Sequence, residues 1–294
     1  MLKTAGKKIS WDHKCDLARQ AMQAAVELRL DHGAGLEEPV SAYSICDKLS
    51  VMVRFVDINM EGVYIPKEKP RIHVSIYRPL GRRHFTCAHE LGHHIFGHGA
   101  SLDDVREDAD AYDGAHPDEF LADAFAGHLL MPVLGIRQAF SRRGIRIDKA
   151  VPKDILSVST EFGVGYEALL TQLAFAFNNI TPSHRSELLR SRPAFRRKLS
   201  GGSEATEIFL IDDGFMASML DIEVNCLIVA PEGTTATDDI LRPVGRNIFG
   251  IVFRATRRGT VNLVGPTFSR RLDVRVAPER FIGLAQYRYL EDGE

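Results

Sequence analysis

The sequence has few cysteines, little net charge and no long apolar run, and each shortage removes a class of protein. The 294-residue chain has four scattered cysteines without paired spacing, namely Cys15, Cys46, Cys87 and Cys226. This pattern argues against a disulfide framework or a thiolate zinc site and favours a reducing, cytoplasmic location. A formal net charge of −2 excludes a protein that wraps nucleic acid over its whole surface. No apolar run approaches the length of a membrane span, and residues 1–8 lack the apolar core of a signal peptide, so we expect no membrane partner.

One stretch combines metal-binding and acid–base residues at helical spacing. Residues 85–94 contain His-Glu-x-x-His, as His89, Glu90 and His93. Positions four apart lie on one face of an α-helix, so both imidazoles can bind one metal ion. Glu90 can then reach a metal-bound water and take its proton as the general base. Because three fixed letters also occur by chance, the alternative is a surface helix with a histidine-rich end.

A second apolar helix, predicted over residues 118–131, supplies two carboxylates. Glu119 and Asp123 are four apart and therefore share a face. A catalytic zinc site needs three protein ligands and an open position, so we predict Glu119 as the third ligand. Asp123 is predicted to accept the free N–H of a ligand histidine and to fix its orientation. His116 and His128 are competing ligands, and a pair of solvent-facing carboxylates is the plain alternative.

These two segments resemble the ImmA/IrrE metallopeptidases. The resemblance rests on Phe-Thr-x-Ala-His-Glu-Leu-Gly-His at residues 85–93 and on Glu-x-x-Ala-(Asp/Asn)-x-Phe-Ala-x-x-Leu-Leu-Met-Pro at residues 119–132. It is close there and looser over residues 10–200. It implies a zincin-like zinc metalloendopeptidase of the gluzincin type, although Mn²⁺ or Fe²⁺ can also occupy a His/His/Glu site. The implied substrate is a helix-turn-helix (XRE-type) repressor, whose cleavage relieves repression of a stress regulon (DNA damage or radiation) or of a mobile element.

The predicted elements divide an α+β chain into three units. Residues 1–140 form the zincin-like domain, with helices and strands at 10–31, 39–49, 51–56, 63–65 and 71–76 before the two motif helices. In zincins the strand before the metal-binding helix often forms the cleft edge, where an extended substrate can pair. Residues 141–200 form a helix-turn-helix-like helical unit. A helix at 133–143 leads into it, and further helices are predicted at 153–162, 166–177 and 184–199.

Residues 204–294 change character and are predicted to be rich in strands. We expect strands at 208–211, 226–229, 248–253, 261–264, 272–276 and 286–290. Glycine and proline, among them Pro243 and Gly245, punctuate the region. In IrrE-like relatives this region resembles a GAF domain, so we expect a β-rich GAF-like sensor domain on the basis of layout alone.

Charge is unevenly spread along the chain. The segment Asp103–Asp118 is strongly acidic, so it either borders the site and attracts a basic partner or is simply a solvated loop. No lysine or arginine occurs from Asp154 to Ser183. A helix that reads DNA needs cations for phosphate and guanine, so we expect a structural or protein-binding role there and no direct DNA binding.

Two other functions stay open at this point. One is a metal-dependent hydrolase of a toxin–antitoxin pair, and the other is a non-catalytic sensor or scaffold with a structural metal. Glu90 disfavours the second, because a structural site has no use for a base. Candidates for stabilising an oxyanion are Tyr77, Arg82, Arg83 and His84. The oligomeric state, the activating signal and the identity of the repressor are left open by the sequence.

Overall fold

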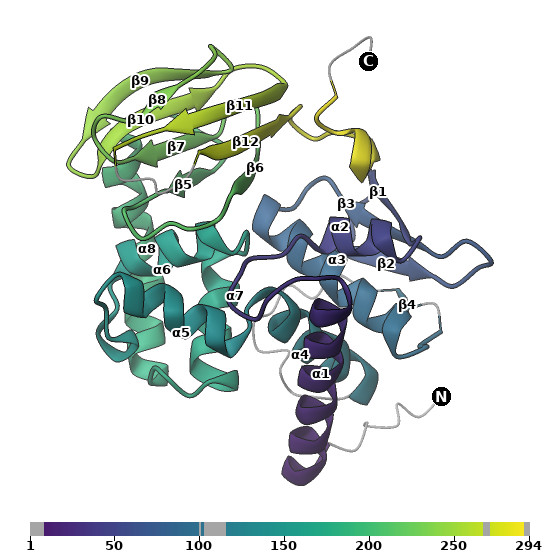
Figure 1. Cartoon of the computed structure of the whole chain (residues 1–294). Helices are drawn as coiled ribbons and strands as arrows, with labels where there is room; N and C mark the ends of the chain where they lie inside the picture. The colour runs from purple at the N-terminus through teal and green to yellow at the C-terminus, as the bar shows by residue number, and fades with distance from the viewer. Residues whose placement is uncertain (1–8, 100, 103–115, 267–270, 291–294) are drawn as a thin grey trace.

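The computed structural model describes residues 9–99, 101–102, 116–266 and 271–290, and it shows a mixed α+β chain (Figure 1). The N-terminal part combines one mixed sheet with four helices, which are α1 (Trp11–Asp31), α2 (Ala42–Lys48), α3 (Leu80–Ile95) and α4 (Pro117–Leu130). Its strands are β1 (Met52–Val56), β2 (Gly62–Ile65), β3 (Arg71–Ser75), β4 (Ser101–Leu102) and, from the far end of the chain, β13 (Gly283–Leu284). The strand order is β13-β1-β3-β2-β4, with β1 and β3 parallel.

Strand β3 lies in the middle of this sheet, which corrects the prediction that the strand before the metal-binding helix forms an edge. It pairs with β1 on one side and with β2 on the other. The edge beyond β2 is formed by β4. The alternation of apolar residues shows which face of a strand is buried, but it carries no information about the strand's neighbours.

Particular residues explain where α1 begins and why the two motif helices, α3 and α4, pack closely. Helix α1 begins after Ser10, whose side chain accepts a hydrogen bond from His13 N. Helices α3 and α4 lie close together because residue 92 is a glycine. A Cβ at Gly92 would lie 3.1 Å from both Ala122 Cα and Phe125 Cδ1, so a larger residue would push the helices apart.

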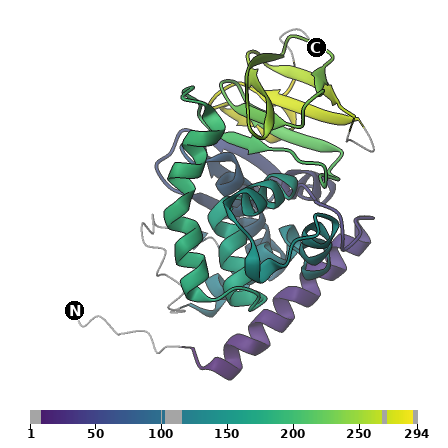
Figure 2. The same ribbon diagram turned by 90° about the vertical axis from the view of Figure 1, so that its left-hand side faces the viewer.

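The middle of the chain is helical, as predicted. It contains α5 (Val133–Arg142), α6 (Pro152–Glu161), α7 (Tyr166–Thr171), a π-helical turn (Gln172–Ala176), α8 (Pro182–Ser200) and a 3-10 turn (Ile147–Lys149). Figure 2 shows α8 rising along this part toward the C-terminal sheets. One hydrophobic core extends from Leu17 to Leu188 and therefore spans the N-terminal and middle parts. The predicted division of the chain at residues 140 and 204 stays a prediction.

The C-terminal part contains two four-stranded sheets (Figure 1). One has the order β5-β7-β10-β9, with strands at Ile208–Leu210, Leu227–Ala230, Gly250–Ala255 and Leu241–Asn247. The other has the order β6-β12-β11-β8, with strands at Met219–Glu223, Leu272–Ala277, Gly259–Val264 and Thr235–Ala236. Strands β6, β8 and β9 were not predicted from the sequence. Strand β9 runs through Pro243 and Gly245, which it tolerates because it lies at the edge of its sheet.

The strand predicted at residues 286–290 is wrong. The chain instead forms β13 and then a 3-10 turn, Ala285–Tyr287, next to β1 (Figure 1). Leu284 is paired with Arg54 and Gly283 with Phe55. Arg288 stabilises the turn, because its buried guanidinium donates to Ala285 O at 2.5 Å. Residues 283 and 284 therefore belong to the first sheet and not to the C-terminal sheets.

Within the described ranges, no single helix is both long enough and apolar enough to cross a membrane. Taken together, helices α4 and α5 have the length and apolar composition of such a helix, but the pair is bent by 40° at the break between them.

Candidate metal centre

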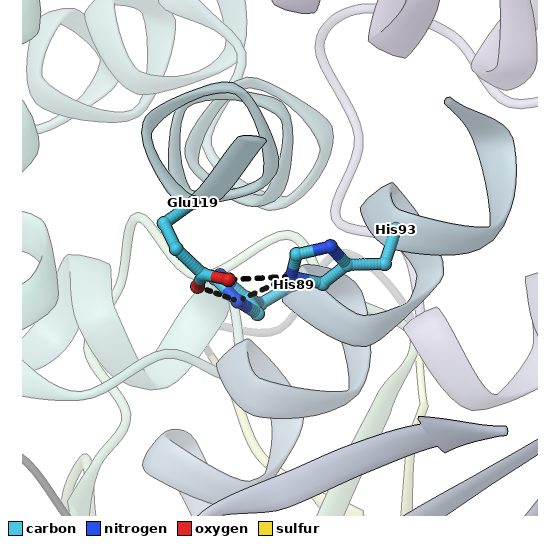
Figure 3. A group of neighbouring side chains, drawn as sticks. All are labelled: His89, His93 and Glu119. Atoms are coloured by element: carbon cyan, nitrogen blue, oxygen red, sulfur yellow. Dashed lines mark hydrogen bonds and ion pairs between the residues drawn. The ribbon is translucent and has the colours of Figure 1, made fainter. Parts of the chain in front are cut away.

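Two histidines of α3 and a glutamate of α4 face one another (Figure 3). His89 and His93 are one turn apart, and Glu119 lies in the first turn of α4. The two Nε2 atoms are 3.1 Å apart. Glu119 places Oε2 3.3 Å from His89 Nε2 and Oε1 3.6 Å from His93 Nε2. The structure thus brings together the three ligands proposed from the sequence, with their ligand atoms within 4.8 Å of one another.

These separations fit a single metal ion. Ligand atoms about 2.0–2.1 Å from a tetrahedral zinc ion lie about 3.3–3.4 Å from one another. The three separations, from 3.1 to 3.6 Å, bracket that value. Two imidazoles and one carboxylate are also the donor set of catalytic zinc sites, which keep a further position for water. The residues present therefore fit such an ion.

Charge supports the same assignment. The hydrogen bonds from His89 and His93 lower the pKa of Glu119. A carboxylate with a lowered pKa stays ionised at neutral pH, as a metal ligand must.

Asp123, one turn beyond Glu119 on α4, orients the first histidine. Its Oδ1 lies 2.8 Å from His89 Nδ1. In the neutral tautomer that a metal ion requires, Nδ1–H donates to this carboxylate, and Nε2 carries a lone pair that faces the other two ligands. This is the arrangement expected from the spacing of Glu119 and Asp123.

His98 orients the second histidine, and sequence analysis missed it. Its Nδ1 lies 2.9 Å from His93 Nδ1, and its Nε2 lies 3.5 Å from Asp118 Oδ1. If His93 Nδ1–H donates to His98, then His98 Nε2–H points toward Asp118. The chain reaches this position because α3 ends and Gly97, with φ +68°, turns it back. A glycine just after a helix marks such a reversal and was the available signal.

Glu90 lies on α3 against strand β2 and is completely buried. Gly62, the first residue of β2, makes this close packing possible. A Cβ there would lie 2.5 Å from Thr86 Cγ2 and 3.2 Å from Glu90 Oε1. Gly62 lies just before the strand predicted at 63–65 and was not connected with the site from the sequence. A glycine inside a strand often marks such a close backbone approach.

The other candidate ligands lie outside this group. His116 precedes α4 as its N-cap residue. The ring of His128 packs against Phe177, with centroids 6.3 Å apart. Of the acidic segment Asp103–Asp118, residues 103–115 lie outside the described residues, and Asp118 belongs to α4.

The four candidates for an oxyanion stabiliser have other partners. Tyr77 donates to Asp57, and Arg82 donates to Glu61 at 3.0 Å. Arg83 pairs with Glu223, as described below. His84 is buried, accepts from Ala42 N at 2.9 Å and lies 2.9 Å from Gly163 O. The contacts of Arg82, Arg83 and His84 tie α3 to its surroundings.

A helix pair that directs two histidines and a glutamate to one point, with a buried glutamate beside the first histidine, is the arrangement of a metal-dependent hydrolase. Residues 46–174 match the family model of the IrrE N-terminal-like domain, Peptidase M78. The match includes both motif helices and supports an ImmA/IrrE family member, which confirms the resemblance drawn from the motifs. It suggests a metallopeptidase linked to regulation and implies a metal cofactor, typically zinc.

No curated protein matches the chain. Among solved structures, one similar to it is a Mycobacterium tuberculosis transcriptional regulator, with 18% sequence identity and a TM-score of 0.37. The match covers 55% of this chain and 49% of that one, so it spans about half of the regulator.

Proposed function

We propose that this chain is a metal-dependent endopeptidase of the gluzincin type, with zinc as the default ion. His89, His93 and Glu119 would hold the ion, and Glu90 would be the general base. The observation that carries the proposal is the convergence of three ligand atoms from α3 and α4 at 3.1–3.6 Å. A bound ion would polarise the scissile carbonyl and acidify the attacking water.

The chain's own residues supply the remaining steps. Asp123 and His98 hold the two imidazoles with their Nε2 atoms toward the centre. The Glu90 carboxylate accepts a proton from the attacking water and passes it to the nitrogen of the leaving amine. Strand β2 covers Glu90 at Gly62, which limits the positions that this carboxylate can adopt.

The proposed substrate is a helix-turn-helix repressor of the XRE type, in a stress or mobile-element regulon. The family match over residues 46–174 supports it. The same proposal includes a cytoplasmic location, a zincin-like catalytic domain, a helix-turn-helix-like middle unit and a GAF-like C-terminal domain.

The test compares native protein with Glu90→Gln and Glu119→Ala, using a repressor encoded beside the chain's own gene. Metal content is measured after dialysis, and cleavage is followed by mass spectrometry. We expect Glu90→Gln to retain metal and fold but to lose cleavage, since an amide cannot act as a base. Glu119→Ala should lose both metal and cleavage. Cleavage by Glu90→Gln at the native rate would refute the mechanism, and equal metal content in all three would remove Glu119 from the ligands.

A further inference from the structure

The first turn of the metal-binding helix is held by the C-terminal part of the chain. Leu80 begins α3, and the N-cap residue Pro79 has no side-chain hydrogen bond to offer. Instead, Leu80 N donates to Glu207 Oε1 at 2.7 Å, across 127 positions of sequence. The first N–H groups of a helix lack acceptors within the helix, and a carboxylate is favourable at that end. Glu207, just before β5, therefore acts as the cap of α3.

A second contact joins the same turn to strand β6. Arg83 Nη1 lies 2.5 Å from Glu223 Oε1, and only 7% and 5% of the two side chains are exposed. Arg83 Nε also donates to Arg78 O at 2.5 Å, which holds the guanidinium in place. A buried ion pair of this kind is sensitive to loss of either partner, because the remaining charge is left uncompensated. Both contacts line a cavity of about 730 Å³ between the parts of the chain.

These contacts act on the geometry of the centre through the helix itself. From Arg83 to His89 is six residues of α3, or about 9 Å along a rigid helix. Glu119 is carried by α4, which is a separate helix. A shift of the first turn of α3 therefore changes the separation of His89 and His93 from Glu119.

We infer that Glu207 and Glu223 are positioning residues for the metal-binding helix, so that the C-terminal part sets the metal affinity and turnover of the centre. The turnover part rests on the proposed function. The metal part rests on the His/His/Glu geometry alone.

The chain offers a matched control for this inference. Arg143 Nε pairs with Asp212 Oδ2 at 2.8 Å, with 4% and 16% of the side chains exposed. This pair also joins the C-terminal part to the rest of the chain. It does so next to α5 and not at α3. Asp212→Asn thus removes one charge of this contact without touching the metal-binding helix, and Arg143 keeps its second partner, Glu161 Oε2, at 2.8 Å.

The experiment titrates Co²⁺ into full-length, metal-free protein and follows the visible absorption of the bound ion. Native protein, Glu223→Gln, Glu207→Ala and Asp212→Asn are compared. We expect Glu223→Gln and Glu207→Ala to bind Co²⁺ about 10–100-fold more weakly, with an altered spectrum, as do variants that disturb the support of metal ligands. Asp212→Asn should lower the thermal midpoint but keep native cobalt affinity and spectrum. The double variant Arg83→Glu/Glu223→Arg should recover part of the lost affinity.

Two results would overturn the inference. One is native cobalt affinity and spectrum in both glutamate variants, and the other is an equal loss in Asp212→Asn. Glu207→Ala removes the acceptor of Leu80 N, so it remains informative if Glu223→Gln does not fold. If the native protein itself binds no cobalt, the metal centre and the proposed function fail as well. If native protein binds Co²⁺ tightly and both glutamate variants bind it equally well, only this inference fails.

Discussion

Gly62→Ala tests whether close packing of β2 on α3 sets the position of Glu90. The new Cβ would lie 2.5 Å from Thr86 Cγ2, 3.1 Å from His73 O and 3.2 Å from Glu90 Oε1. Carbon atoms normally approach to about 3.5–4.0 Å, so the strand or the helix must move by about 1 Å. Thr86 is buried, and overpacking of this kind costs about 1–3 kcal/mol of stability. A catalytic group displaced by about 1 Å can lose about 10²-fold in rate.

The assay measures kcat/KM for repressor cleavage and the free energy of unfolding in denaturant. Gly165→Ala is the control, because a Cβ there meets nothing within 4 Å, and it should leave both quantities near native. Thr86→Ser removes the methyl group that the new Cβ would strike. The double variant Gly62→Ala/Thr86→Ser should therefore recover much of the lost stability and activity. Native activity in Gly62→Ala, or a double variant no better than the single one, would refute the steric argument.

Two further predictions concern the support and the charge of the centre. His98→Ala should weaken metal binding about 10–100-fold, because His93 loses its Nδ1 partner; unchanged affinity by chelator competition would remove His98 from this role. The pKa of Glu119 is lowered in the folded chain from an ordinary value of 4.5. The ionised Glu119 side chain therefore stabilises metal-free protein above pH 4.5. This stabilisation is lost as the pH falls through the pKa that Glu119 has in the folded chain. Acid unfolding followed by circular dichroism should show native protein losing stability below about pH 4.5 relative to Glu119→Gln, and parallel curves would contradict it.

Sequence alone predicted the parts of the site that lie on two helices. His89, Glu90 and His93 are linked by helical spacing, and the pairing of Glu119 with Asp123 follows from the same period. Most helices and many strands followed from apolar periodicity and caps, as Ser10 illustrates.

Features that depend on contacts distant in sequence were not predictable in this way. The contact between Gly62 and Glu90 needs the packing of a strand on a helix. The cap on Leu80 comes from Glu207, and no local pattern connects the two. The central place of β3 depends on the order of strands, which periodicity does not encode.

The pairing of β13 with β1 has a consequence for synthesis of the chain. Arg54 pairs with Leu284, which a ribosome adding about 5–20 residues per second reaches roughly 10–50 s later. During that time β1 has an unpaired edge, and such an edge invites pairing with other chains. Closure across so long a stretch is also intrinsically slow. We therefore expect the nascent chain to depend on chaperones. Aggregation during expression should fall at low temperature, because hydrophobic association between exposed chains weakens on cooling.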